Sequence, residues 1–489
     1  MKFLDRLAAR LGYSKSFRPN RFVRAFDGAK TDNISIGFKP ANNAIDQELV
    51  GSLDMLRGRS RTLAQNNDHA KKFLRMVKTN VVGPEGFKLQ ALAADGGKAD
   101  AFARGVIEAG WLDWGRKGNC EVSRLYSFTD VERLLIETVA RDGEAILRHV
   151  RGRSVGGGYG YACQVLDVDR LATHLNGTGP EGRIVMGVEL NSVGAPVAYH
   201  LHESHPNGNW ANPSSRVLRV PAGDVLHVYT SERPEQHRGI PWMHTAMLRL
   251  ENLGKFERAA LTAARKGAQS LGFFQSPDGE PPPGEEKDED GNQIHTSLEG
   301  EFDTLPPGYQ FQQFDSKYPS EIYGSFVKDC LRSISSGLGV AYNGLANDLE
   351  GVNFSSIRAG VLEERDVWMT LQTWMAEHIL TPIFREWLSM ALLSGRLGTL
   401  PAMKFEKFAA HKWQPRRWPW VDPRADMEAK LMAIRAGLDT RRDVAAEQGK
   451  DFDDVVEQLS LENKALAAAG VNSDLGGTPP AAPAAKSSP

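Results

Sequence analysis

PWMHTAMLRLENLGKFERAALTAARKGAQSLGF (241–273) is the stretch of sequence that decides the fold. Its apolar residues recur at steps of three and four, which is typical of an amphipathic helix. Pro241 suits the first turn of such a helix. The apolar stripe consists of Met243, Met247, Leu250, Leu253, Phe256, Ala260 and Ala264. A helix over this range would be a rod of ~50 Å, at about 1.5 Å per residue.

An acidic insertion and a second helix follow this rod. The insertion, 275–315, contains PDGEPPPGEEKDEDG, and between 278 and 303 ten acids face the single Lys287. The spacing of Tyr323, Val327, Leu331, Ile334 and Leu338 predicts a helix over 319–338. A helix pair capped by a projecting insertion suits a subunit that stands beside copies of itself. The pattern therefore indicates a ring or tube rather than an active-site pocket.

A third helix is predicted over 355–393, after the loop GVAYNGLANDLEGVN (339–353). Trp368, Leu371, Met375, Ile379 and Ile383 lie on one side of it. Pro382 stands inside this run. Because proline lacks a backbone donor, we expect it to remove a hydrogen bond and bend the helix.

The N-terminal half reads as an α+β domain behind a basic arm. Residues 1–45 carry nine Lys and Arg against three Asp, and a short amphipathic helix is predicted at their start. Helical spacing continues from Leu49 to Lys78, and Thr129 with Glu132 matches a capping box for the next helix. Strands follow from Gly143, including a hairpin around Asn191–Gly194.

The C-terminal part begins with an aromatic segment, HKWQPRRWPWVDP (411–423). Stacking of its tryptophans on single-stranded nucleic acid is one interpretation, and an aromatic joint between two domains is the favoured one. Residues 424–469 are predicted to form short helices that turn at Gly437 and Gly449, and the low-complexity end is predicted to be disordered.

Composition excludes several classes of protein. The 489 residues are 41% apolar and 25% charged, with a net charge of −2, which argues against a polycation that coats nucleic acid. Cys120, Cys163 and Cys330 lie far apart and form no CxxC pair, so a reducing compartment is expected. No apolar run approaches the ~20 residues of a membrane span, and the basic N-terminus lacks a signal-peptide core.

Two segments match patterns of metal sites. HLHESH places His200 and His202 on one face of a strand, with Glu203 and His205 nearby. LDVDR offers Asp167 and Asp169, which some metal-dependent nucleases would use. Neither has the supporting context that such a site needs. We favour a strand-end carboxylate pair, with Arg170 offsetting its charge.

Two glycine-containing motifs are judged by their context. GRSVG (152–156) has the letters of a nucleophile elbow around Ser154, but no helix is predicted after the serine. GGGYG (156–160) lacks the strand and helix of a phosphate-binding loop. We expect no catalytic residue, metal or cofactor.

Five segments together resemble the lambda family of tailed-phage portal proteins, over roughly residues 15–470. They are NNDHAKKFLRMVKTNVVGPEGF (66–87), ARDGEAILR (140–148), HVYTSERPEQHRGIPWMHTAM (227–247), SISSGLGVAYNGLANDLEGVNFSSIRAGVLEERDVW (333–368) and WPWVDPRADMEAKLMAIRAGL (418–438). The resemblance implies a largely helical α+β portal fold. It also implies a ring of usually twelve subunits at one capsid vertex, in the virion, after assembly in the host cytoplasm.

The family's anatomy can be carried onto this sequence segment by segment. The resemblance implies a basic arm (1–45), a wing (46–240), stem helices (241–273 and 319–340), an acidic clip (274–318), a tunnel loop (341–354), a long kinked helix returning to the wing (355–423), a crown (424–470) and a disordered tail (471–489). It implies passage of double-stranded DNA without sequence specificity and a clip that docks the terminase large subunit and later the head–tail connector. Major capsid and scaffold proteins are further implied partners, and no membrane is.

The candidate site residues fall in two of these segments. The clip residues are Glu285, Glu286, Asp288, Glu289 and Asp290. The channel residues are Asn343, Asn347, Asp348, Glu350 and Asn353, with Lys328 and Arg332 on the second stem helix. A protein that neutralises 6–10 phosphates loses ~10³–10⁵ in affinity between 50 and 200 mM salt. Such a strong electrostatic hold would hinder sliding, so a mixed or weakly acidic channel is expected.

Sequence alone does not decide what the other stem cations contact, and it leaves two rival functions open. Arg249, Lys255, Arg258, Arg265 and Lys266 would either touch phosphates or pair with acids such as Glu251 and Glu257. One rival is a metal-dependent hydrolase or nuclease that uses His200, His202, Asp167 and Asp169. The other is a monomeric capsid-associated adaptor that binds a basic partner through its acidic insertion.

Overall fold

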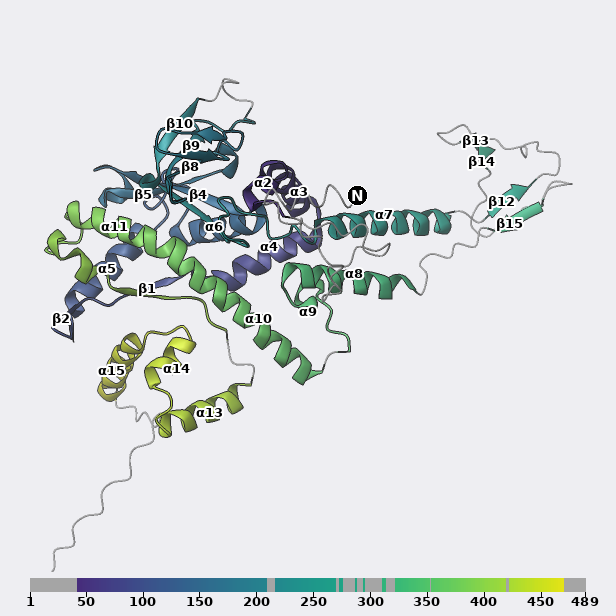
Figure 1. Ribbon diagram of the computed structural model, residues 1–489. Helices are drawn as coiled ribbons and strands as arrows, with labels where there is room; N and C mark the ends of the chain where they lie inside the picture. The colour runs from purple at the N-terminus through teal and green to yellow at the C-terminus, as the bar shows by residue number, and fades with distance from the viewer. Residues whose placement is uncertain are drawn as a thin grey trace, which may run out of the picture.

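The computed structural model describes residues 42–208, 216–269, 272–275, 286–287, 293–294, 310–313, 322–351, 353–418 and 422–469 (Figure 1). The predictions for the basic arm before residue 42, for the tail after 469 and for most of the acidic insertion lie outside these residues. Within them the chain combines many helices with small antiparallel sheets, so the predicted α+β class is confirmed.

Helices open the described chain and cover its sheets. The helical spacing over 49–78 corresponds to three helices with short breaks. The helices are α2 (Ile45–Val50), α3 (Leu53–Asn66), α4 (Asp68–Val81), α5 (Ala101–Trp114) and α6 (Phe128–Asp142). Asn67 caps α4 by accepting from the Ala70 N–H, as its position before the helix would suggest.

The cap of α6 differs from the sequence prediction. Ser127, rather than Thr129, is the N-cap, and its reciprocal partner is Asp130. Glu132 is instead buried inside the protein, where its carboxyl accepts from the Phe87 N–H at 3.3 Å. Burial raises the pKa of Glu132 to about 8.

Two antiparallel sheets stack in the N-terminal half. One has the order β11-β4-β5 and the other β10-β9-β8-β7-β6. The predicted hairpin is present, with the Asn191–Ala195 turn joining β8 to β9. The strands are β4 (Glu144–Arg151), β5 (Tyr161–Leu166), β6 (Gly177–Thr178), β7 (Arg183–Val185), β8 (Val188–Leu190), β9 (Pro196–His202), β10 (Val217–Pro221) and β11 (Val225–Tyr229). Apolar side chains from both sheets form one buried cluster.

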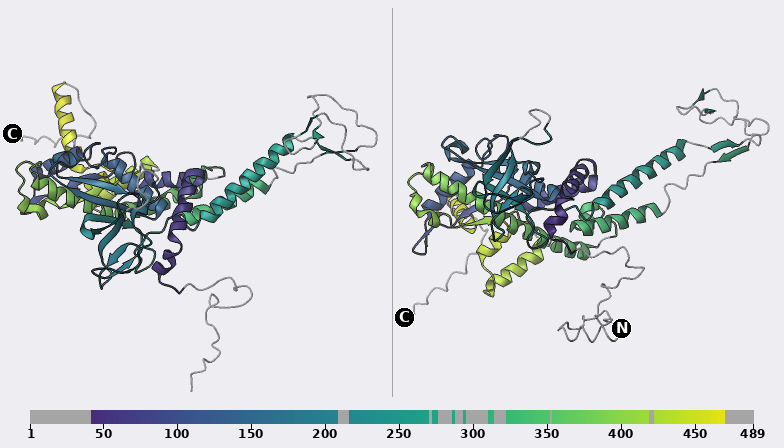
Figure 2. Two further views of the ribbon diagram at one scale, coloured as in Figure 1. Left: turned by 90° about the horizontal axis from the view of Figure 1, so that it is seen from above. Right: turned by 45° about the horizontal axis from the view of Figure 1, so that its top comes forward.

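Two helices project together from this body (Figures 1 and 2). They are α7 (Met247–Gln269) and α8 (Ile322–Leu338), and the paired strands β12 (Gly272–Gln275) and β15 (Gln310–Gln313) lie at their far end. Two further short strands, β13 (Glu286–Lys287) and β14 (Gln293–Ile294), pair with each other. The predicted helix over 241–273 is shorter at both ends: α7 begins at Met247, since residues 242–246 form turns whose Met243 and Ala246 side chains are buried, and Phe273 belongs to β12.

The third predicted helix is present but is built in three pieces. It comprises α10 (Phe354–Met375), a π-helical turn labelled η5 (Ala376–Leu380) and α11 (Thr381–Leu393). The Thr381 N–H donates to the Ala376 carbonyl, five residues back. Pro382 then occupies the first turn of α11, where a missing donor costs little. The wider π turn thus accommodates the proline inside the run.

The largest core joins α5, α6, α11 and the β4–β5 strands. Trp111 is at its centre, with ring centroids 5.1 Å from Trp387, 4.8 Å from Trp114 and 5.0 Å from Phe128. Trp114 and Trp387 are fully buried. Burial of such rings, with edge-to-face contacts, contributes about 0.5–1.5 kcal/mol per pair beyond the area that they bury.

The aromatic segment packs on the N-terminal half of the chain. Residues His411–Gln414 form β16, which pairs with β1 (Lys88–Ala91). The Arg416 guanidinium lies 5.5 Å from the Trp418 ring, and the Trp418 Nε1 donates to Asn80 at the end of α4. Trp420 lies outside the described residues.

Three helices follow the aromatic segment, in agreement with the predicted helical segment. They are α13 (Pro423–Arg435), α14 (Arg441–Glu447) and α15 (Phe452–Ala468). Gly437 and Gly449 separate them with φ of 71° each, a left-handed conformation that favours glycine.

Candidate functional site

The predicted channel residues lie where α8 meets the start of α10. Lys328 and Arg332 are on α8, and Asn343 is in the short helix α9 (Tyr342–Ala346), so the expected loop is partly helical. Asn347 ends α9 in the left-handed conformation, with φ of 54°. Asp348 and Glu350 follow in a turn, and Asn353 directly precedes α10.

Asp348 organises this turn. Its Oδ2 accepts from the Tyr342 hydroxyl at 2.6 Å, and its Oδ1 accepts from the Glu350 N–H at 3.0 Å. The hydrogen bond from Tyr342, followed by those from Glu350 and Lys328, lowers the pKa of Asp348 to about 2. The carboxylate is therefore ionised at any pH that the protein is expected to meet.

Lys328 is bound by the acids of the loop. Its Nζ lies 3.0 Å from Asp348 Oδ2 and 3.2 Å from Glu350 Oε2. Hydrogen bonds to Asp348 and Glu350 raise the pKa of Lys328. We call Lys328, Tyr342, Asp348 and Glu350 the Lys328 cluster. In it, the lysine that sequence alone would offer to a phosphate already has two carboxylate partners.

Neighbouring contacts hold the loop on two sides. Lys72 of α4 donates to the Asn347 side chain at 2.9 Å. Arg332 lies over the Tyr342 ring at 5.5 Å and pairs with Asp329 at 3.0 Å. From 322 to 351 the described chain carries two cations and three acids. The surface is mixed and weakly acidic in charge.

Among the other stem cations, one is paired with an acid and three have no such partner in the described chain. Lys255 pairs with Glu251 at 3.1 Å, one helical turn away. Arg249, Arg258 and Arg265 are exposed and have no ion pair among the described residues. The Lys266 side chain is outside the described part.

Of the predicted clip residues, Glu286 is described only as the first residue of β13. Glu285, Asp288, Glu289 and Asp290 are outside the described residues.

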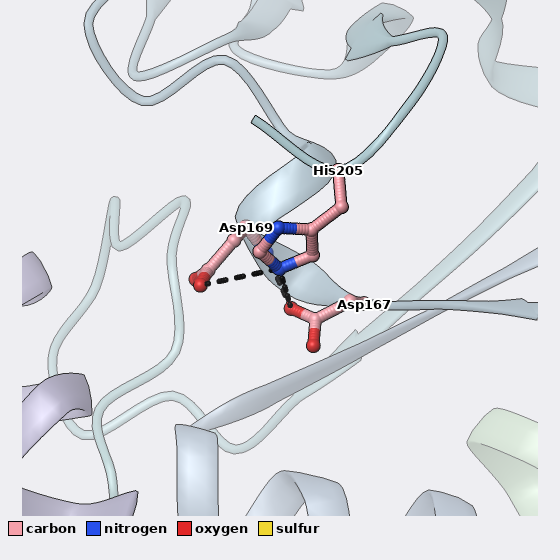
Figure 3. A group of neighbouring side chains, drawn as sticks. All are labelled: Asp167, Asp169 and His205. Atoms are coloured by element: carbon pink, nitrogen blue, oxygen red, sulfur yellow. Dashed lines mark hydrogen bonds and ion pairs between the residues drawn. The ribbon is translucent and has the colours of Figure 1, made fainter. Parts of the chain in front are cut away.

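Side chains of the two metal-like motifs lie close together, but they are not the combination of residues that the sequence predicted (Figure 3). His205 Nε2 lies 3.8 Å from a carboxylate oxygen of Asp167 and 3.8 Å from one of Asp169. His200 does not join them, because it faces the buried Glu189 at 3.3 Å on the neighbouring strand. His202 packs against the His174 ring, with centroids 5.5 Å apart.

Arginines already occupy these carboxylates. Arg61 donates to Asp169 at 2.5 Å and to Asp167 at 3.0 Å, and Arg57 donates to Asp169 at 3.1 Å. Burial opposes ionisation of Asp169, but hydrogen bonds and charge from Arg61 and Arg57 outweigh it and lower its pKa. A divalent cation would have to displace guanidinium groups. The prediction that Arg170 offsets this charge is wrong, since Arg170 donates to the His202 and Glu203 carbonyls.

This surface cluster continues into a buried ionic network. Glu144 is fully buried, and its carboxylate accepts from Arg57 at 2.8 Å and from Arg238 at 2.5 Å. Burial alone would raise the pKa of Glu144, but the charge of Arg238 and a hydrogen bond from His227 hold it well below its usual range. The network joins α3, the start of β4 and the segment leading to α7. It therefore fixes the base of the projecting rod to the sheets.

The other motifs show no catalytic geometry. Ser154 lies in a turn, and a three-residue 3-10 helix (Gly156–Gly158) follows instead of the α-helix that a nucleophile elbow requires. Gly156 approaches the Tyr161 backbone so closely that an added Cβ would lie 1.8 Å from the Tyr161 carbonyl oxygen. These glycines therefore serve a tight turn.

Comparison with known families decides the identity of the chain. A model of the lambda family of phage portal proteins matches residues 31–372. The chain belongs to this family. It is similar to the probable portal protein of Halomonas phage phiHAP-1, with 35% identity over 464 residues, 93% of this chain and 89% of that protein. It is also similar to portal protein B of Escherichia phage lambda, with 24% identity over 473 residues, 89% and 88% of the two chains.

Solved structures give a looser match to this portal protein. A chain from the neck of an empty gene transfer agent (GTA) particle aligns over 86% of this chain and 98% of its own length, with a TM-score of 0.43 and 16% identity. A chain from the virion of a native GTA particle gives the same TM-score with 13% identity, over 85% and 98% of the two chains. Among the described helices, none is both long and apolar enough to cross a membrane.

Proposed function

We propose that this portal protein acts as a ring, usually of twelve copies, at one vertex of the capsid, and that double-stranded DNA passes through the ring during packaging and ejection. The proposal assigns it no catalytic step, metal or cofactor. It places the protein in the virion, after assembly in the host cytoplasm. The observation that carries the proposal is the Lys328 cluster, in which two carboxylates neutralise a cation that would otherwise hold phosphates.

The physical reason lies in repetition around a ring. One free lysine in each subunit becomes twelve around the channel, and a contact with 6–10 phosphates makes binding strong and steeply dependent on salt. A DNA duplex that must slide through the ring needs weak, evenly distributed contacts with the protein. The pairing of Lys328 with Asp348 and Glu350 supports such a lining, as does the excess of one acid over 322–351.

The segment roles are part of the proposal. We infer a wing over 46–240, stem helices over 241–273 and 319–340, and a clip over 274–318 at the far end of the rods. We further infer a tunnel loop over 341–354, a helix returning to the wing over 355–423 and a crown over 424–470. The clip would dock the terminase large subunit and then the head–tail connector, and the outer ring would contact major capsid and scaffold proteins. The projection of α7 and α8 away from the body supports this order.

The assembly itself is tested first. Mass photometry of the purified full-length protein is expected to give a particle of about twelve chains, and negative-stain images are expected to show a central hole. A solitary chain under assembly-permissive conditions would contradict the proposal and favour the monomeric adaptor.

Removing both acidic partners of Lys328 tests the proposed channel lining. Replacing Asp348→Asn together with Glu350→Gln should raise the affinity of the ring for labelled duplex DNA and steepen its loss between 50 and 200 mM salt. The matched control adds Lys328→Ala to the same pair and should return binding to the original level. Unchanged binding in the double variant would show that the Lys328 cluster does not face DNA.

A further inference from the structure

The last three helices of the described chain leave their apolar side chains uncovered. None of α13, α14 and α15 contains a buried residue. On α13 and its C-terminal turn, Met427, Leu431 and Leu438 are exposed, the last of them by 84%. On α15, Val456, Leu459 and Leu461 are each about half exposed. Exposed apolar side chains that gather on neighbouring helices are typical of an interaction site.

The helix α15 is exposed along most of its length. A shallow hollow of about 560 Å³ runs along it, lined by Val456, Leu459, Ser460, Asn463, Lys464 and Ala467. These residues recur at steps of three and four, so they share one side of the helix. Phe452 lies one turn before Val456 on the same side, and its ring lies 5.3 Å from the Arg442 guanidinium of α14. Thus the N-terminal end of this face meets α14, and the rest of it, from Val456 to Ala467, is open.

Polar contacts attach these helices to the rest of the chain. Asp426 of α13 pairs with Arg358 at 3.0 Å, and Asp451 accepts from Gln90. The attachment therefore leaves the apolar faces of α13 and α15 available to another molecule.

Charges at the two faces are complementary. Arg435 and Arg441 flank Leu438, and neither has an ion-pair partner in the described part of the chain. Glu457 and Glu462 on α15 are exposed and likewise lack one there. The unpaired charges beside the α13 patch are thus basic, and those on the two flanks of the α15 face are acidic, while Lys464 lies within that face.

We propose that the α13 face of one copy packs on the α15 face of the next, so that the partner is a second copy of this chain. Two different, complementary patches on one chain make a head-to-tail contact, and such contacts close into rings when the rotation permits. The inference rests on the proposed ring, and it names the surface that joins neighbouring subunits at the crown.

Cysteine cross-linking in the full-length ring tests this contact. Leu431→Cys and Leu459→Cys are combined in a Cys330→Ser background, because Cys120 and Cys163 are buried. A short bismaleimide should give a ladder of covalent multimers. Moving the first cysteine to Val193, an exposed residue of the β8–β9 hairpin, should abolish the ladder. Mixed rings that contain each single variant on separate chains should give dimers only.

The outcomes separate this inference from the proposed function. If rings form by mass photometry but the double variant gives no multimers, the crown contact is wrong and the ring stands. If a chain ending at residue 469 gives the ladder and the full chain does not, the C-terminal segment covers α15 instead and the inference also fails. Without a ring, the proposed function itself fails. As a second measurement, Arg435→Glu should weaken the ladder several-fold, and adding Glu457→Arg should restore it.

Discussion

Lys328 of α8 and Asp348 of the following turn form an ion pair of 3.0 Å across 20 residues of chain. The pair closes the α9 turn onto the rod, and Lys72 fastens the same turn to α4 through Asn347. A segment that is proposed to face moving DNA is thereby held by contacts that are individually weak, since exposed ion pairs contribute about 0–1 kcal/mol.

We predict that Lys328→Ala loosens the loop without unfolding the protein. Amide hydrogen exchange over 342–351 should become faster by several-fold, because the loop loses both carboxylate contacts of the lysine. The global melting temperature should fall by no more than a few degrees. Lys255→Ala, which removes the exposed pair with Glu251 on α7, is the matched control and should leave that exchange unchanged.

Removing one partner of the buried ionic network should have a much larger effect. Arg238→Met leaves Glu144 buried without its main counter-charge, and loss of one partner from such a pair costs about 3–5 kcal/mol. Thermal unfolding followed by circular dichroism should show the loss. Arg385→Met breaks an exposed pair with Glu406 and should change stability by less than about 1 kcal/mol. Equal effects would mean that the network does not fix the rod to the sheets.

Because of Glu132, the stability of the folded protein should fall as the pH rises. Its pKa of about 8 in the folded chain lies above the usual 4.5, so the folded state binds the extra proton between these values. The contribution of Glu132 to the free energy of unfolding is therefore largest below about pH 4.5, and it decreases as the pH rises toward 8. Glu132→Gln should remove this decline and raise stability at pH 8.5 by a few kcal/mol. Chemical unfolding at pH 6 and 8.5 measures it, and a decline that persists in the variant would refute the assignment.

The Asp167–Asp169–His205 group should not bind a divalent metal tightly. Arg57 and Arg61 hold both carboxylates, so titration of the ring with Zn²⁺ or Mn²⁺ should show no uptake above that of an Asp169→Asn variant. Nuclease assays should be equally negative. Stoichiometric metal that Asp169→Asn removes, with hydrolysis that His205→Ala abolishes, would revive the hydrolase alternative.

The rod helices were predictable because a three-and-four repeat of apolar residues is local. Stripes such as Leu250, Leu253 and Leu331 are buried between α7, α8 and the body, as the pattern requires. Boundaries were less predictable. The letters of Thr129 and Glu132 match a capping box as well as those of Ser127 and Asp130 do, and only the burial of Glu132 decides between them.

The side-chain clusters were beyond sequence reasoning for a different reason. Arg61 reaches Asp167 across 106 positions, and His205 reaches the same group from the end of another sheet. Such contacts depend on how the helices pack on the sheets, and no local spacing signals them. The Lys328 cluster was partly accessible, since a lysine near an acidic, glycine-containing turn was visible in the sequence, but its pairing was not.

The π turn before Pro382 has a consequence for what each half of the long helix can touch. One surplus residue in a turn rotates everything after it by roughly 100° about the axis. Side chains that would have continued along one line instead point toward a new neighbour. Thus α10 packs on α4, where Gln372 donates to the Asn80 carbonyl, whereas Phe384 and Trp387 of α11 meet Trp111 of α5. Deleting a single residue between 376 and 380 would therefore misdirect the tryptophan core, although every residue that forms it would still be present.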